Sequence, residues 1–396
     1  MSQGESSGKP VSKPVKGAQQ HPGLTDEAIE KVRGLIGVWL RRDVHAPARY
    51  EAIAPGDIRR WAQYAVGDDN PLWCDSEYAK RTMWGGIIAP PSFLGTVDSG
   101  LVAPGLPGIQ WIYAGSRWEH HFQVRVGDVV SARARLIDVQ VKEGRNVPRF
   151  VNQVGEVLYT NQNNQLVARY EGDYFRIPRA RSGGGIKKST EPRTPYRYTD
   201  EQIEEIAQAY RNEERRGAEP RYWEDVKIGD ELPTLWKGPL TLVDIVGFYV
   251  GRQTTYSVLR SAFLDRDKHP ANVYTSPTRN IPVHPAAGHF DAEIAREIGM
   301  PDVYDQAWQR INWGGHLVTN WMGDMGFVRR LSGRITKPNF LGDLTKMNGK
   351  VTDCRKEANE ALVDIEWWGT NQKDQRTCDG KATVRLPSRD ISIQVL

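Results

Sequence analysis

The chain carries an internal duplication, and this limits its fold more than any other feature of the sequence. Gly127-Asp128 recurs as Gly342-Asp343 at an offset of 215 residues, and Asp138 recurs as Asp353 at the same offset. A repeat of this length predicts two similar supersecondary units whose apolar faces cover each other. Neither unit should form a complete structure alone.

The second copy should contain an insertion. Asp75 matches Asp291 at an offset of 216, whereas Asp57, in the helical pattern upstream, matches Asp244 at an offset of only 187. These offsets differ by 29 residues. We therefore place an insertion between Asp244 and Asp291, at about residues 255–284.

Helix signals precede strand signals in each copy. Pro55 stands in the first turn of a predicted helix, and Thr241 precedes Asp244 at the spacing of a capping box. Strand-like stretches follow at 129–140, 150–159, 166–177, 346–352, 361–368 and 380–386. This order predicts an α+β fold in which each unit wraps an antiparallel sheet around a long central helix. In the second unit we place that helix at about 316–330.

Domain organisation follows from the repeat and from the composition between its copies. A Gly/Ser/Pro-rich stretch at 1–24 reads as a flexible tail, 25–180 as the first unit, 181–219 as a linker with a polar helix, and 220–396 as the second unit. With 396 residues and 39% hydrophobic content, the chain can bury two sizeable cores.

Charge and cysteine usage narrow the class of protein. The three cysteines form neither a disulfide framework nor a metal-binding pair, and no apolar run approaches the roughly 18 residues of a membrane span. We therefore expect a cytoplasmic protein without membrane contact. The net charge of +4 is modest, and its basic residues crowd the stretch between the copies, from Arg176 to Arg197. No fold signature for nucleic-acid binding accompanies them.

A motif in the first half supplies a resemblance. Residues 67–75 read Gly-Asp-Asp-Asn-Pro-Leu-Trp-Cys-Asp and follow a helical pattern. They resemble the G-D-x-N-P-x-H-x-D signature of the MaoC-like acyl dehydratases and (R)-specific enoyl-CoA hydratases, with Trp73 in place of the histidine. Both halves also end in Arg-hydrophobe-Pro, at 176–178 and 385–387. The resemblance covers about 25–180 and 220–390 and implies a double hotdog, in which Asp68, Asn70 and Trp73 form a degenerate motif.

The resemblance also implies a reaction. Hydration of a 2-enoyl thioester requires a water to lose a proton as it attacks C3 while a proton reaches C2, and one aspartate and one histidine can do both. Backbone N–H groups at a helix start suit the thioester oxygen as it gains negative charge. By resemblance, Gly314 and Gly315 would supply them. Their first-half counterpart contains Pro90 and Pro91 and so has fewer donors.

Neither half holds a complete catalytic pair. Asp68 lacks its histidine, and we expect it to brace its own loop. In the second half His289 stands at the histidine position and is the candidate acid/base, the alternative being a structural hydrogen-bonding role at a helix end. The second half should therefore be the working half.

The acidic partner of His289 stays open between several residues. Counting five positions back gives His284, whereas counting forward from the helix gives Thr254 or Thr255. Asp265 and Asp267, inside the insertion, could also reach the site.

Other polar and aromatic groups have plainer interpretations. His120 and His121 are adjacent on a predicted strand and should face opposite ways, so no metal site is expected. Trp308, Trp313 and Trp321 cluster around the proposed donor segment. They belong either to the core or to an aromatic wall around a bulky acyl group.

Three functions are compatible with these residues. The first is a hydratase/dehydratase acting on a 2-enoyl-CoA and its (3R)-hydroxyacyl-CoA, with the substrate carried on coenzyme A and no other cofactor. The second is a thioesterase or another lyase on the same scaffold. The third is a non-catalytic thioester-binding or partner subunit. Arg and Lys side chains of the linker are candidates for contacting the coenzyme A phosphates, and a homodimer of double hotdogs is a further expectation.

Overall fold

The computed structural model of the protein describes residues 23–44, 52–144, 147, 149–178, 192–253, 258–270, 273–276 and 278–391. The strands of its first half are β1 (Trp39–Val44), β2 (Ile109–His120), β3 (Ser131–Lys142), β4 (Phe150–Thr160) and β5 (Leu166–Pro178). Those of its second half are β6 (Glu231–Lys237), β9 (Phe327–Ile335), β10 (Thr345–Glu357), β11 (Glu360–Asn371) and β12 (Arg376–Leu386). A separate hairpin pairs β7 (Tyr274–Thr275) with β8 (Pro282–Val283).

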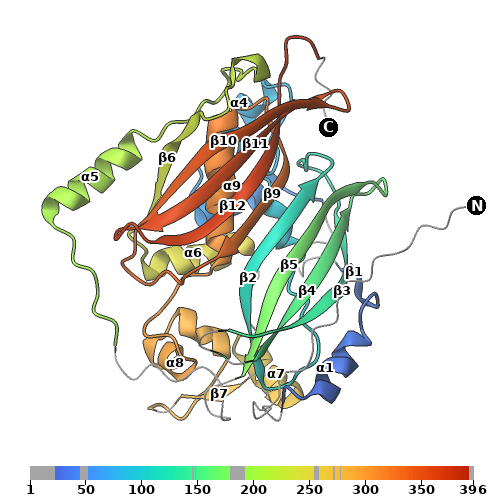
Figure 1. Cartoon of the computed structure of the whole chain (residues 1–396), viewed down its shortest axis with the longest axis vertical. Helices are drawn as coiled ribbons and strands as arrows, with labels where there is room; N and C mark the ends of the chain where they lie inside the picture. The colour runs from blue at the N-terminus through green and yellow to red at the C-terminus, as the bar shows by residue number, and fades with distance from the viewer. Residues whose placement is uncertain are drawn as a thin grey trace, which may run out of the picture.

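The two halves have the same strand order, and their sheets join edge to edge. The first half runs β1-β3-β4-β5-β2 and the second β6-β10-β11-β12-β9, within one ten-stranded sheet (Figure 1). They meet where residues 115–119 of β2 pair antiparallel with residues 330–334 of β9. A Cβ on Gly115 would come 2.4 Å from the Gly333 carbonyl oxygen, so this close approach requires glycine. The predicted double hotdog is confirmed.

The helices cover one face of this sheet and its ends. They are α1 (Asp26–Arg33), α2 (Pro55–Arg60), α3 (Pro71–Cys74), α4 (Ser76–Lys80), α5 (Asp200–Arg211), α6 (Leu242–Arg252), α7 (Arg260–Lys268), α8 (Ala292–Glu297) and α9 (Trp308–Met322). Two predicted starts are confirmed, since Pro55 opens α2 and Thr241 caps α6 in a capping box with Asp244. None of the described helices is long and apolar enough to cross a membrane.

The second half contains the long central helix, but not where the sequence placed it. All fifteen residues of α9 are buried, and the helix lies behind the strands of the second half in Figure 1. It begins eight residues before the predicted start at 316, and β9 begins at Phe327, inside the predicted helix. Gly314 lies inside α9, where the absence of a side chain lets the helix pack closely on Trp367. A Cβ at this position would lie 2.8 Å from the Trp367 ring.

The first half lacks a comparable helix, which differs from the prediction of one in each unit. Residues 86–108 are all described, and they contain only the 3-10 turn Phe93–Thr96. Four prolines in this segment, at 90, 91, 104 and 107, remove backbone donors and prevent a long helix.

One hydrophobic core runs through both halves. Trp61 of the first half lies 6.2 Å from Phe248 on α6 and 5.9 Å from Trp308 on α9, measured between ring centroids. Because these rings belong to one buried cluster, the two units share their interior. The domain boundaries stay predictions. Residues 1–22 of the tail and residues 179–191 around the start of the linker, including Arg179, Arg181, Lys187 and Lys188, lie outside the described residues.

Candidate active site

The two copies of the motif lie at opposite ends of the β2–β9 seam. In the first half, Trp73 borders a hollow together with His120 at the end of β2 and Phe327 at the start of β9. In the second half, His289 borders a hollow together with Trp111 at the start of β2 and Ile335 at the end of β9. Each end of the seam is therefore a possible place for a site, and the two ends differ in their side chains.

Local sequence places His289 at the end of a short turn. His284 caps the 3-10 turn Pro285–His289, and its Nδ1 accepts the Ala286 N–H at 3.1 Å. Asp291 caps α8 immediately afterwards, with its Oδ1 accepting the Glu293 N–H at 2.8 Å. These two caps fix the direction in which His289 leaves the backbone.

A backbone carbonyl sets the tautomer of His289. Its Nδ1 lies 3.0 Å from the Tyr304 carbonyl oxygen, which can only accept, so Nδ1 carries the hydrogen. Nε2 is then an acceptor in the neutral ring. The ring keeps some contact with solvent but is largely enclosed, and this burial lowers the pKa of His289 to about 4. At neutral pH it is an uncharged base.

The part of α9 that lies beside His289 is its start, not Gly314 and Gly315. Both glycines lie in the middle of α9, where their amides belong to the helix, so the prediction of donors there was wrong. The helix begins after Ala307, which has no side-chain cap and which borders the same hollow as His289. At the start of α9, the Gln309 N–H donates to the Gln306 carbonyl oxygen and the Arg310 N–H to the Ala307 carbonyl oxygen. The positive end of the helix dipole at this point attracts negative charge.

A buried ion pair holds this end of α9 in place. The Asp305 and Arg310 side chains are each 1% exposed, and a nitrogen of Arg310 lies 2.7 Å from an Asp305 oxygen. Burial raises the pKa of Asp305, and the Arg310 guanidinium opposes that shift. Arg310 also donates to the carbonyl oxygens of Lys337 and Thr377, which ties α9 to the end of β9.

Two hollows meet at His289. The seam hollow, of about 200 Å³, is bordered by Trp111, Tyr113, Phe175, Met300 and Ile335. The loop hollow, of about 220 Å³, is bordered by Gly105, Leu106, Ile109, Arg176 and His284. His289 and Tyr304 line both.

Arg176 stands in the wall of the loop hollow and does not offer its charge to a ligand phosphate. It is buried, and it donates to the carbonyl oxygens of Ala103, Gly105, Leu106 and Ile109 and to the Gln153 side chain. Another basic residue between the copies, Arg193, forms an ion pair with Asp343.

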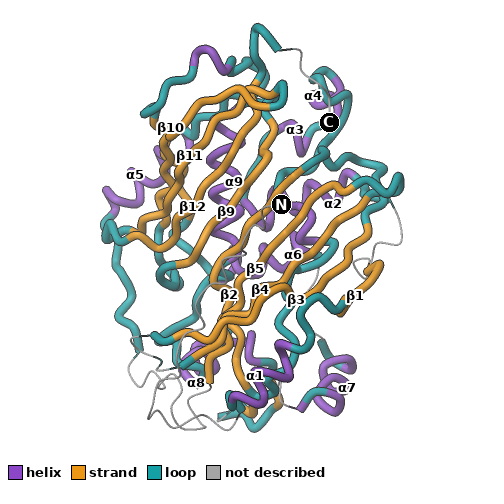
Figure 2. Tube along the Cα trace, turned by 45° about the vertical axis from the view of Figure 1, so that its right-hand side comes forward, coloured by secondary structure: helices purple, strands orange, loops and turns teal. Residues whose placement is uncertain are grey.

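The structure brings only part of the predicted set to His289. His284 lies beside it in the loop hollow. Asp265 and Asp267 are exposed on α7, where Asp267 pairs with Arg266, and α7 lies away from α8 in Figure 2. Among the described residues, no carboxylate forms an ion pair with His289, and Thr254 and Thr255 lie outside them. No group of three or more potential metal ligands occurs in the described ranges.

The three tryptophans predicted as a pocket wall are buried in the shared core. Trp308, Trp313 and Trp321 are each 6% exposed or less. None of them borders the seam hollow or the loop hollow. This arrangement matches the interpretation of core packing.

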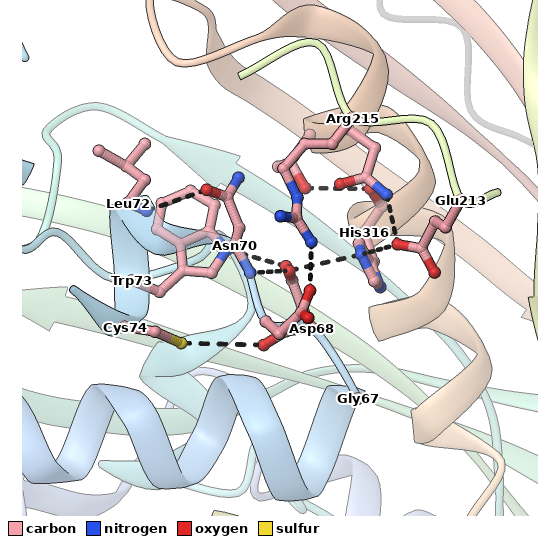
Figure 3. Close-up of polar contacts among 12 residues, drawn as sticks. Gly67, Asp68, Asn70, Leu72, Trp73, Cys74, Glu213, Arg215 and His316 are labelled. Atoms are coloured by element: carbon pink, nitrogen blue, oxygen red, sulfur yellow. Dashed lines mark hydrogen bonds and ion pairs between the residues drawn. The ribbon is translucent and has the colours of Figure 1, made fainter. Parts of the chain in front are cut away.

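In the first half, the Asp68 carboxylate is held by a hydrogen bond from Trp73 (Figure 3). Asp68 Oδ2 accepts the Trp73 indole N–H at 2.8 Å, and Oδ1 accepts the Asn70 backbone N–H at 2.9 Å. Asn70 in turn caps α3 by accepting the Leu72 N–H. The hollow beside Trp73 measures about 30 Å³, the volume of roughly one water in the liquid. Asp68 braces its loop at a closed end of the seam.

A buried polar cluster joins this loop to the second half. We call Asp68, Glu213, Lys237 and His316 the clasp. His316 Nδ1 lies 2.9 Å from Lys237 Nζ, which also donates to the Val66 and Gly67 carbonyl oxygens. His316 Nε2 lies 3.2 Å from Glu213 Oε1 and 3.4 Å from Asp68 Oδ1, at ion-pair distance but without hydrogen-bond geometry (Figure 3).

The clasp was not predicted, although the sequence contains one signal for it. Asn312, His316 and Asn320 recur every four residues and so share one face of a helix. Polar residues aligned in this way on an otherwise apolar helix indicate buried polar partners. Those partners, Glu213 and Lys237, come from the linker end and from β6, which no local spacing connects.

The clasp carries strongly shifted charges. Burial lowers the pKa of Lys237, which nearby carboxylates oppose. Burial alone would raise the pKa of Glu213, but the close contact with His316, the charge of Lys237 and the hydrogen bond from the Asn320 amide hold it at about 2. Glu213 is therefore an anion stabilised by folding.

Acid should weaken the fold through Glu213. Its folded pKa of about 2 lies below the ordinary value of about 4.3, so its contribution is present above that value and is lost as pH falls toward 2. In Glu213→Gln, the free energy of unfolding should therefore fall less between pH 5 and pH 2.5 than in the wild type. Denaturant unfolding over this range measures it. Glu214→Gln, at an exposed neighbour, should follow the wild type, and equal slopes for all three proteins would contradict the assignment.

Comparisons with known proteins agree with this geometry. Residues 42–170 match the family model of the FAS1-like dehydratase domain region. A solved MaoC-like dehydratase has a TM-score of 0.61 and 18% identity over 90% of this chain and 99% of its own. A MaoC domain dehydratase from Chloroflexus aurantiacus J-10-fl has a TM-score of 0.58 and 14% identity over 94% of this chain and 100% of its own. The likeness to these two solved structures shows the fold, which the chain shares with proteins named MaoC-like dehydratases, the family that the motif at 67–75 resembles.

Sequence relatives give the family. A UPF0336 protein of Parafrankia sp. (strain EAN1pec) is 34% identical over 118 residues, which are 28% of this chain and 74% of that protein. A UPF0336 protein of Thermobifida fusca (strain YX) is 25% identical over 123 residues, or 29% of this chain and 80% of that protein. The chain belongs to the family of these UPF0336 proteins. The matched dehydratase region supports a hydratase or dehydratase kind of function.

Proposed function

We propose that the chain catalyses the reversible hydration of a 2-enoyl-CoA to a (3R)-hydroxyacyl-CoA at the second-half end of the seam. The observation that carries this proposal is the position of His289. Its Nδ1 is held by the Tyr304 carbonyl, and its ring borders two hollows beside the uncapped start of α9. This places a neutral base next to the positive end of the α9 dipole, which suits a developing oxyanion.

One base can carry out both proton transfers of the proposed reaction. His289 Nε2 takes a proton from water as the water oxygen bonds to C3, and the electron pair of the C2–C3 double bond moves to give an enolate at the thioester. The positive end of the α9 dipole stabilises the enolate oxygen. The His289 ring then returns the proton to C2. His284 borders the same hollow and serves to position the water.

A second candidate is thioester binding without turnover. No carboxylate pairs with His289 among the described residues, and the first-half end of the seam has room for about one water. Both observations suit a subunit that holds a thioester for another enzyme. The same assay separates the two candidates.

The test is a panel of 2-enoyl-CoA thioesters with acyl chains of increasing length. Loss of the enoyl absorbance on adding the protein, with formation of the (3R)-hydroxyacyl product, is the expected result. Binding of the thioesters by calorimetry without any change in absorbance would support the binding subunit and contradict the hydratase. Release of free thiol would indicate a thioesterase.

A further inference from the structure

Strand β2 has an unpaired edge inside the active-site region. Residues 110–113 pair with β5 on one side, through partners from Ile177 to Tyr174. On the other side, the pairing with β9 stops at Gly115. The main-chain groups of residues 110–114 that point toward β9 therefore have no strand partner in the described structure.

The edge is unpaired because β9 turns away from it. After Ile335, the backbone N–H of Thr336 donates to the Thr377 carbonyl oxygen, so the chain follows β12 instead of β2. Arg310 reinforces this path by donating to the carbonyl oxygens of Lys337 and Thr377. The seam hollow occupies the space that is left.

All five residues of this edge, from Gln110 to Ala114, border the seam hollow, and each is half-buried. An unpaired strand edge is a template for a ligand that presents alternating N–H and C=O groups. A fatty acyl chain presents none. The ligand that fits must be linear and must carry amides.

We infer that the β2 edge at 110–114 binds the pantetheine arm of the thioester substrate through main-chain hydrogen bonds. This inference rests on the proposed function, which makes the ligand an acyl thioester. The pantetheine arm is linear and has two secondary amides, each with one donor and one acceptor. Laid along β2 in the seam hollow, it brings the thioester to His289 and to the start of α9, and it leaves the loop hollow for the acyl group.

The other end of the seam provides an internal control. Residues 327–329 of β9 extend past the last β2 partner, Arg330, just as residues 110–114 extend past Gly115. The hollow there measures only about 30 Å³ and cannot admit an arm of this size. If the inference holds, ligand binding should therefore affect residues 110–114 and not residues 327–329.

Hydrogen exchange of the full chain tests the inference without turnover. The probes are an S-alkyl CoA thioether, which cannot react, and the same thioether with both pantetheine amide nitrogens methylated. With the first probe bound, at least one amide within 110–114 should exchange about tenfold more slowly, whereas amides of 327–329 should not change. The methylated probe should bind about tenfold more weakly for each lost hydrogen bond.

The outcomes separate this inference from the proposed function. Tight binding of the thioether with unchanged exchange at 110–114 would overturn the inference and leave the hydratase proposal standing. Slower exchange at 110–114 in a protein that hydrates no enoyl-CoA would overturn the hydratase proposal. The inference that the β2 edge binds the pantetheine arm would still stand. Failure of every thioether to bind would overturn both. The same exchange experiment with the S-alkylated pantetheine group attached to an acyl carrier protein identifies the carrier. Protection of residues 110–114 by either probe supports the inference.

Discussion

Replacing His289 with alanine should lower enoyl-CoA hydration by roughly 100-fold or more, the usual worth of a positioned acid/base. The variant loses the ring whose Nδ1 is fixed by Tyr304 and whose Nε2 faces the reacting water in the proposed mechanism. Steady-state rates with the best substrate of the thioester panel measure the loss. Thermal unfolding of the variant should stay close to that of the wild type.

The pH profile distinguishes a catalytic His289 from a structural one. Because burial lowers the pKa of His289 to about 4, the ring is a base above that value, and the rate should fall as pH decreases through it. His289→Ala should lose this limb as well as the rate. Trp73→Phe is the matched control at the corresponding position of the first half, and its rate should stay within a few-fold. A larger loss in Trp73→Phe than in His289→Ala would overturn the site assignment.

Replacing Lys237 with methionine should destabilise the protein by about 3–5 kcal/mol, the range for removing one partner of a buried charge network. The ammonium group serves two backbone carbonyls and the His316 ring, and it lies among the charges of the clasp at 6% exposure. Methionine fills the space but satisfies none of these groups. Urea unfolding measures the change.

An exposed lysine on β10 provides the control. Lys350→Met removes the same charge from the surface and should change the free energy of unfolding by about 0.5 kcal/mol or less. If Lys237→Met were no more destabilising than Lys350→Met, the clasp would not hold the two halves together.

Most of the fold could be predicted because the repeat fixed which segments correspond. The strands predicted at 150–159 and 361–368 match β4 and β11 within a few residues. Neither strand of the seam was among the predicted strand ranges, although a strand was expected next to His120. Glycine at 115 and 333 weakens their strand pattern, and it occurs there because the two backbones approach closely. That approach is a tertiary property and has no local signal.

Only those parts of the candidate site could be predicted that depend on the residue at a single motif position. His289 was proposed from its match to the motif histidine, and Trp73 indicated that the first half shapes the pocket or supports the fold. The donors were predicted wrongly, because Gly314 and Gly315 suggested a helix start, whereas both lie in the middle of α9, Gly314 against Trp367 and Gly315 against Leu331. Tyr304 and the β2 edge reach His289 from distant parts of the chain, and only the folded structure brings them there.

The covalent connection between the halves has a consequence for the two ends of the seam. In a symmetric pair of identical subunits, every substitution appears at both ends at once, so closing one end also closes the other. Here each end is encoded separately. Tryptophan could fill one end and donate its indole N–H to a structural aspartate, while histidine at the other end borders two hollows. A single chain can thus assign rigidity to one end and chemistry to the other.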